Sequence, residues 1–125
     1  MSAPVAAPRL LVVCGSRYWR SRRTIVSCLR SARAQGFTHV IHGGCRGADA
    51  IAGEEAARLG FHVVVVPANW RRDGKMAGTM RNAAMLELKP QLVLAFAQQL
   101  QKSRGTGYTV QLARIFGIPV RVFHQ

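Results

Sequence analysis

The sequence contains few acidic residues, and this shortage is its most unusual property. Five Asp and Glu residues stand against 18 Lys and Arg residues in a chain of 125, which gives a formal net charge of +13. Fifteen of the 18 cations are Arg. Such an excess attracts polyanions, so the partners to consider are nucleotides, RNA, DNA and acidic proteins. The alternative interpretation is a solvated basic surface with no specific partner.

The sequence also lacks long hydrophobic runs. Its longest apolar segments are Leu10–Cys14, Val63–Val66 and Leu92–Ala97. These have the length of β-strands and fall far short of the roughly 20 residues that cross a bilayer. We therefore expect no association with a membrane.

Cysteine is scarce, and its spacing excludes two common roles. Cys14, Cys28 and Cys45 are odd in number and lie 14 and 17 residues apart, which fits neither a disulfide framework nor a zinc site. The four His residues show no metal-binding spacing either, so we predict no metal site. Free thiols are typical of a reducing compartment, and we expect an intracellular protein, in the cytoplasm or an equivalent compartment.

Nearly half of the residues, 49%, are hydrophobic, which is the composition of a folded domain. Residues 1–8 form a short tail rich in Ala and Pro that carries no export signal, and we expect this tail to be disordered. Residues 9–125 are predicted to form a single domain.

Hydrophobic periodicity predicts strands and helices in strict alternation. Five runs rich in β-branched residues have strand length: Arg9–Cys14, His39–His42, His62–Val66, Leu92–Phe96 and Val120–Phe123. Between them lie four segments with helical periodicity: Ser21–Gln35, Ala48–Leu59, Ala77–Leu88 and Thr106–Phe116. Three strands are almost continuously hydrophobic, which is typical of strands covered on both faces. This pattern predicts an α/β, Rossmann-like three-layer fold with a mostly parallel five-stranded sheet.

The loops that follow the strands differ from those that follow the helices. Helix-to-strand turns carry Gly or Pro and an apolar residue, which is ordinary for chain reversal. Strand-to-helix loops instead collect small, polar and basic residues. Because ligands of open α/β sheets bind at the carboxyl ends of the strands, these loops are predicted to form the site.

The glycine-rich segment Gly43–Gly47 is the first candidate for holding a phosphate. It lies between a predicted strand and a predicted helix, where glycines allow close approach and the helix N-terminus offers free amides. We expect Gly43, Gly44, Arg46 and Gly47 to bind phosphate, with Asp49 contacting a ribose or orienting Arg46. A purely structural tight turn is the alternative.

Other strand-end residues join this candidate site. Gly15, Ser16 and Arg17 follow the first strand, and Gly105 and Thr106 open the last helix. Segment 69–75 is predicted to be a mobile flap, in which Asn69 is a candidate for ribose or base contacts. Arg81 is a candidate for a second phosphate, with a solvated surface charge as the alternative.

Aromatic and basic residues accompany these loops. Tyr18, Trp19 and Trp70 either stack on a base or close the core. Eleven cations lie in or next to the strand-end loops, and we expect only Asp49 and Asp73 to offset them: Arg17, Arg20, Arg22, Arg23, Arg46, Arg71, Arg72, Lys75, Arg81, Lys102 and Arg104.

The order and spacing of these segments resemble one family. Cys14–Arg17, Gly43–Asp49, Pro67–Trp70, Gly78–Met85 and Arg104–Thr106 are similar to the YspA/YpsA-like branch of the SLOG superfamily, named for the SMF/DprA and LOG proteins. The resemblance runs from about Arg9 to Phe123. It implies a Rossmann-like fold, binding of a nucleotide or a nucleotide-derived ligand such as an ADP-ribose-like molecule, and a homodimer.

The LOG relatives in this superfamily are phosphoribohydrolases that cleave nucleoside monophosphates. By resemblance, Arg81 matches an Arg of their site and is the candidate catalytic residue. The LOG loop Pro-Gly-Gly-x-Gly-Thr-x-x-Glu is only partly kept, because Thr109 stands where the catalytic Glu would be. Without that carboxylate, water activation and stabilisation of an oxocarbenium ion lose their usual agent.

Three functions therefore stand at the level of sequence. The first is a nucleotide-binding sensor or binding module that takes a phosphate-bearing small molecule and needs no defined cofactor. The second is a LOG-like phosphoribohydrolase. The third is a basic component of a ribonucleoprotein, a virion or a DNA-processing complex that binds RNA or DNA through its loops.

Overall fold

The chain forms five parallel strands in the order β3-β2-β1-β4-β5. The computed structural model describes residues 7–124, so most of the predicted tail 1–8 lies outside the described residues. The strands are β1 (Leu10–Gly15), β2 (His39–His42), β3 (His62–Val65), β4 (Leu92–Phe96) and β5 (Val120–Phe123). The predicted fold class is confirmed, and the sheet is parallel throughout.

The four predicted helices form close to their expected bounds. They are α1 (Arg22–Ala34), α2 (Ala48–Arg58), α4 (Ala77–Glu87) and α5 (Arg104–Ile115). Helix α5 begins two residues earlier than predicted, which places Gly105 and Thr106 in its first turn. Two short 3-10 turns, η1 (Gly74–Met76) and η2 (Leu100–Lys102), precede α4 and α5.

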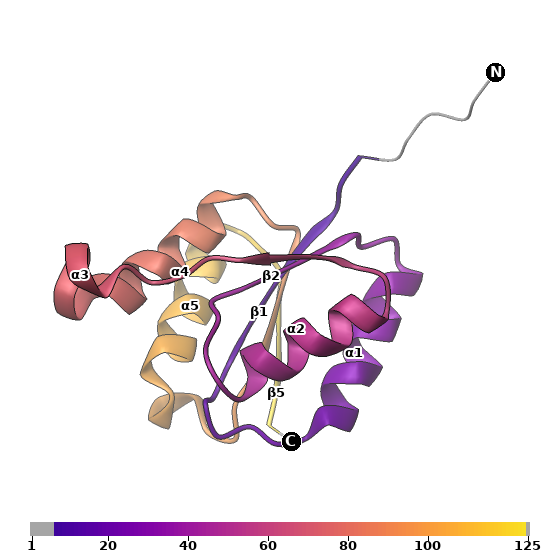
Figure 1. Ribbon diagram of the computed structural model, residues 1–125, viewed down its shortest axis with the longest axis horizontal. Helices are drawn as coiled ribbons and strands as arrows, with labels where there is room; N and C mark the ends of the chain where they lie inside the picture. Colours follow the sequence, from indigo (N-terminus) through magenta and orange to yellow (C-terminus); the bar gives the residue numbers. More distant parts are fainter. Residues whose placement is uncertain (1–6, 125) are drawn as a thin grey trace.

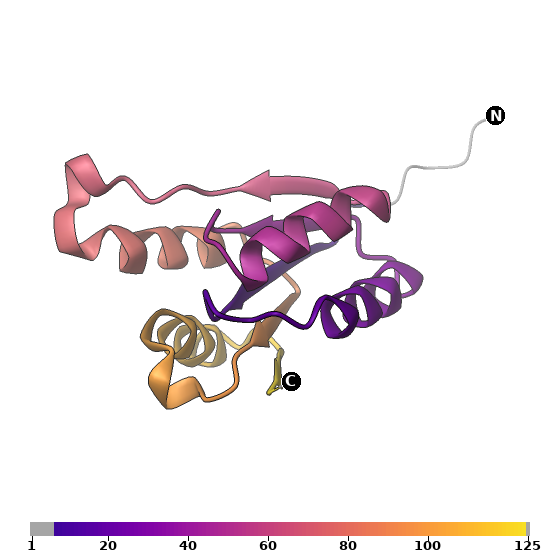
Figure 2. The same ribbon diagram turned by 60° about the horizontal axis from the view of Figure 1, so that its bottom comes forward.

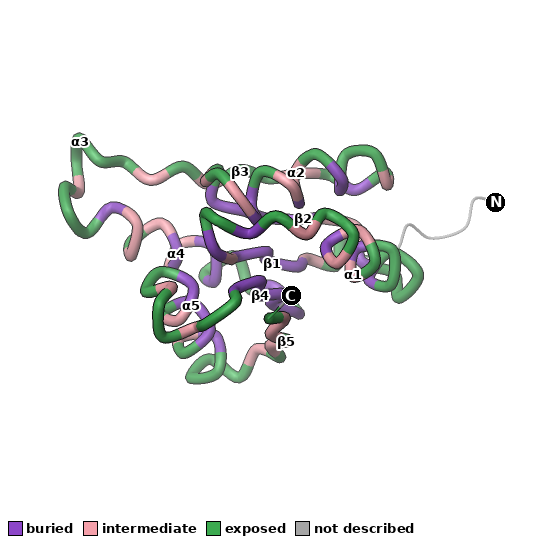
Figure 3. The backbone as a smooth tube through the Cα atoms, turned by 90° about the horizontal axis from the view of Figure 1, so that it is seen from below, coloured by how far each residue is buried: buried purple, intermediate pink, exposed green. Residues whose placement is uncertain are grey.

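The helices cover the two faces of the sheet in pairs (Figure 1). Leu11 and Val13 of β1 pack with α1 and α2, while Val12 and Cys14 of the same strand pack with α4 and α5. This alternation buries β1 on both sides, and β4 is buried along its whole length. Figure 3 shows both strands in the buried centre.

Strand β3 departs from the expectation that the hydrophobic strands are covered on both faces. It lies at the edge of the sheet, and the side chains of Val64 and Val65 are 36% and 51% exposed. At this edge the helices cover the faces of the sheet incompletely, so the apolar run of β3 stays largely exposed.

The predicted flap folds into a short helix, α3 (Trp70–Asp73), followed by η1. Residues 67–76, which we call the arm, extend from β3 to α4 and reach beyond the sheet (Figure 2). Trp70 and Met76 are each 56% exposed on this arm.

Candidate nucleotide-binding site

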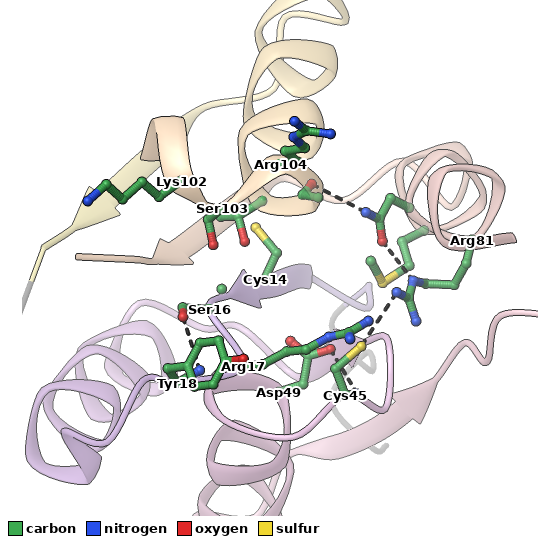
Figure 4. A pocket seen from close by; sticks show the side chains of 15 residues that line it. Cys14, Ser16, Arg17, Tyr18, Cys45, Asp49, Arg81, Lys102, Ser103 and Arg104 are labelled. Atoms are coloured by element: carbon green, nitrogen blue, oxygen red, sulfur yellow. Dashed lines mark hydrogen bonds between the residues drawn. The ribbon is translucent and has the colours of Figure 1, made fainter. Parts of the chain in front are cut away.

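A pocket of about 270 Å³ lies at the carboxyl ends of β1 and β4. The strand order reverses direction between these two strands, and such a switch point is where open α/β sheets bind ligands. One wall is the segment that ends β1 and follows it, and the opposite wall is the start of α5 (Figure 4). The lining residues are Cys14, Gly15, Ser16, Arg17, Tyr18, Cys45, Asp49, Arg81, Asn82, Met85, Lys102, Ser103, Arg104, Gly105 and Thr106.

The start of α5 offers the pocket unused hydrogen-bond donors. Gly107 is the first residue of the helix whose amide bonds back, to the carbonyl of Ser103, and no side chain caps this end. Within the described part of the chain, the amides of residues 104–106 therefore have no acceptor, as expected for a first helical turn. Lys102 and Arg104 add two cations to the same wall.

The glycine loop, residues 43–47, is held from inside the protein. The Gly43 and Cys45 amides donate to Oδ2 of Asp49 over 3.0 and 3.3 Å. The Gly44 amide donates to Nδ1 of His42 over 3.0 Å. These three amides are therefore already paired, and the pocket lining does not include Gly43, Gly44, Arg46 or Gly47.

Two glycines are required by the close approach of the two loops. A Cβ on Gly47 would lie 2.4 Å from the carbonyl oxygen of Ser16, and the residue has a φ of +76°. A Cβ on Gly15 would lie 2.6 Å from the Cβ of Ala48, the first residue of α2, and 2.4 Å from the carbonyl oxygen of Phe96 in β4. The glycine pattern that marks the site in the sequence thus brings the loop after β1 against the start of α2.

Arg81 fixes the glycine loop from the side of α4. Its guanidinium donates to the carbonyl oxygen of Gly43 over 2.5 Å, to Oδ1 of Asn82 over 2.7 Å and to the sulfur of Cys45 over 3.5 Å. Asn82 in turn donates to the carbonyl of Gly105 over 3.3 Å. Arg81 lines the pocket, but its contacts make it a clamp between α4, the glycine loop and the start of α5.

Asp49 is the acidic residue of the pocket, and its side chain is only 6% exposed. Burial raises the pKa of Asp49 to about 6, against the opposing effects of the two loop amides and of Arg81 and Arg17. Burial and the nearby Arg81 lower the pKa of His42, which stays a neutral acceptor for the Gly44 amide.

Two other residues that the sequence singled out lie away from the pocket. Asn69 caps α3 on the arm, where its side chain accepts from the Arg72 amide over 3.0 Å. Thr109 is fully buried in α5, and its hydroxyl donates to the carbonyl of Gly105 over 3.0 Å. The position that matches the LOG glutamate therefore does not face the pocket.

The aromatic residues next to the pocket loops differ in burial. Trp19 is 2% exposed and packs against Phe96 with ring centroids 5.5 Å apart, so it closes the core. Tyr18 is 73% exposed at the pocket, and the Arg46 guanidinium lies 5.3 Å from its ring centroid.

The cations in and next to the strand-end loops have more acidic partners than the sequence indicates. Arg22 pairs with Glu54 and Glu55 of α2, at 2.9 and 2.6 Å, and Arg72 pairs with Asp73 at 2.8 Å. The expectation that only Asp49 and Asp73 offset the strand-end cations is therefore wrong. The two glutamates were missed because they lie on a different helix, 32 and 33 residues away.

No cluster of three or more His, Cys, Asp or Glu residues suited to a metal ion occurs within residues 7–124. Over the same residues, none of the helices combines the length and apolar character that a membrane span needs.

Comparison with known proteins identifies the family. The profile of the YspA, cpYpsA-related SLOG family matches residues 9–72. The chain belongs to this family. It is also 37% identical over 119 residues to the Gene 61 protein of Mycobacterium phage D29, covering 90% of this chain and 94% of that protein.

A solved structure shares the fold of this SLOG domain. DNA processing protein A from Helicobacter pylori, studied for its single-stranded DNA binding mode, matches with a TM-score of 0.73 at 17% sequence identity. The match covers 94% of this chain and 66% of that one. At this identity the likeness establishes the shared Rossmann-like architecture.

Proposed function

We propose that this SLOG domain is a binding module for a phosphate-bearing nucleotide or nucleotide derivative. The observation that carries the proposal is the set of unpaired amides at residues 104–106, which open onto the pocket beside Lys102 and Arg104. Helix N-termini bind phosphate through such amides and through the positive end of the helix dipole. The phosphate contacts that we propose therefore lie at the start of α5 and not at the glycine loop, whose amides are already paired.

The size of the pocket supports a small ligand. Its volume of about 270 Å³ lies near the lower end of the range of ligand pockets, roughly 300–1,000 Å³. One nucleotide suits this space better than a dinucleotide. The exposed ring of Tyr18 at the pocket offers a surface on which a base can stack.

Binding can be measured by calorimetric titration with AMP, ADP-ribose, NAD and cyclic AMP. Arg104→Glu is expected to weaken binding of the preferred ligand at least about tenfold, because one charge-assisted contact contributes roughly 1.5–3 kcal/mol. Arg114→Glu is the matched control, since it makes the same charge change in the last turn of α5. Equal affinity in both variants would contradict the assignment of phosphate to the start of α5.

A second candidate function, binding of single-stranded nucleic acid, is favoured by the charge around the pocket. Arg17, Arg46, Arg71, Lys102 and Arg104 are exposed and make no ion pair with any acidic residue of the described chain. A mononucleotide needs few of these cations. Grooves that combine cations with exposed aromatic rings are typical of proteins that bind single strands, and DNA processing protein A supports this candidate by its fold.

A further inference from the structure

Within residues 7–124, one oxygen of the Asp49 carboxylate has no hydrogen-bond partner. Oδ2 accepts both loop amides, and no described residue donates to Oδ1. Every side-chain oxygen or nitrogen of the described residues that is fully closed off from solvent has a hydrogen-bond partner. The unpartnered Oδ1 is therefore not fully closed off. Since Asp49 is 94% buried and lines the pocket, its free oxygen must be reached from there.

A buried carboxylate is unexpected in a pocket that takes only an anion. Arg17, Arg81, Lys102 and Arg104 attract a phosphate, whereas Asp49 repels it and has lost its hydration. A ligand offsets this cost only if it brings a hydrogen-bond donor to Oδ1 while its anionic group lies elsewhere in the pocket.

The layout of the pocket separates these two requirements. In Figure 4, Asp49 lies on the wall with Arg17 and Tyr18, and Ser103 and Arg104 lie on the opposite wall. A nucleotide with its phosphate at the start of α5 therefore presents its sugar, whose two neighbouring hydroxyls are donors, to the wall that carries Asp49. Its base then lies toward Tyr18.

We propose that Asp49 accepts a hydrogen bond from a ribose hydroxyl and so makes the pocket selective for ribonucleotides over nucleotides that lack those hydroxyls. This inference rests on the proposed nucleotide-binding function and names the ligand class. The glycine loop serves it indirectly, because its amides orient the carboxylate through Oδ2.

The test compares AMP with 2′,3′-dideoxy-AMP by calorimetry in the wild-type protein and in Asp49→Asn. We expect the wild-type protein to bind AMP at least about tenfold more tightly. The Asn variant keeps an oxygen for the loop amides but turns a donor toward the pocket, so its preference for AMP should fall to about twofold or less. Binding of the dideoxy ligand should change little, and thermal unfolding checks that the variant is folded.

The measurements on the wild-type protein decide the question if Asp49→Asn does not fold. Equal binding of AMP and 2′,3′-dideoxy-AMP by the wild-type protein overturns the inference and leaves the nucleotide site in place. Failure of both ligands to bind overturns the proposed function and the inference together. Titration with ribose 5-phosphate tests whether the base contributes to binding. Weaker binding than that of AMP supports a nucleotide as the ligand, and equal binding overturns the nucleotide assignment in favour of a sugar phosphate.

Discussion

Gly47 occupies a backbone position that no other residue type fits without strain. Its φ is +76°, and a Cβ would lie 2.4 Å from the carbonyl oxygen of Ser16, far inside van der Waals contact. Gly117 has nearly the same φ, +75°, but has open space around its Cβ position. We expect Gly117→Ala to cost about 1–2 kcal/mol of unfolding free energy from the left-handed conformation alone. Gly47→Ala should cost about 1–3 kcal/mol more, because the neighbouring loop must move.

Urea unfolding of both variants measures this difference. Equal losses would show that the loop after β1 yields freely, and that the approach of the two loops is not fixed by this glycine.

The pKa of Asp49 leads to a pH prediction for ligand selectivity. A hydroxyl donates to the ionised carboxylate, so the preference for AMP over 2′,3′-dideoxy-AMP should be full above about pH 7 and fall as the pH drops through about 6. Arg81 and Arg17 favour the ionised form of Asp49, while burial lowers the pKa of His42 and raises the pKa of the Cys14 thiol, which favours the neutral form of both.

The ratio of the two affinities is the quantity to measure, because both ligands carry the same phosphate and its own titration cancels. A preference that is constant from pH 5 to 8 would contradict the role of Asp49.

Residue types at the site could be predicted from the sequence, but their hydrogen-bond partners could not. The small residues Gly43 and Gly44 indicate a loop that something approaches closely, yet sequence spacing does not reveal that Asp49 and His42 take up their amides. Arg81 was correctly expected near the loops, but its three contacts within the protein depend on how α4 packs. Which hydrogen-bond partner each of these groups finds depends on the tertiary packing of the elements.

Elements were easier to predict than residue roles, since hydrophobic periodicity acts locally. The N-terminus of α1 lies where the sequence places it: Ser21 caps the helix, and its side chain accepts from the Thr24 amide over 3.4 Å. The start of α5 was missed by two residues because its first turn contains Gly105 and Gly107, which have weak helix propensity. The exposure of β3 was missed because an apolar run does not reveal whether its strand is an edge.

Helix α5 also shows why a LOG-type acid does not fit this chain. Thr109 is fully buried and bonded within its own helix, so Thr109→Glu would place an unpaired charge in the core. We expect it to destabilise the fold by about 3 kcal/mol or more, with no gain of activity. Tyr108→Glu, at a position 36% exposed on the same helix, should change stability by on the order of 0.5 kcal/mol.

Chromatography of AMP after long incubation is the matching activity assay. We expect no release of ribose 5-phosphate by the wild-type protein or by either variant. Turnover by the wild-type protein above about 1 per second, an ordinary enzymatic rate, would assign the chemistry to a different carboxylate, with Asp49 the first to test.

At the scale of the whole molecule, the charge of +13 is unevenly compensated. Glu54 and Glu55 neutralise the start of α1, whereas the edge of the sheet that carries the pocket and the arm keeps unpaired cations. A small ligand leaves most of them unpaired, so a longer polyanion has room to bind beside the pocket. This argument predicts weak binding of single-stranded RNA or DNA that does not depend on sequence.

The dependence of that binding on salt tests where the polyanion lies. Each phosphate contact contributes about 0.7 to the slope of log affinity against log salt for a single strand. Arg71→Glu with Lys75→Glu, both exposed on the arm and outside the pocket lining, should therefore flatten the slope by about 1.4 and leave AMP binding unchanged. Arg30→Glu with Arg114→Glu is the matched control, because it alters net charge equally at exposed positions late in α1 and α5. Equal flattening by both pairs of substitutions would mean that only net charge matters. If the wild-type protein binds no RNA or DNA at about 50 mM salt, the prediction is wrong and an acidic protein becomes the partner to test.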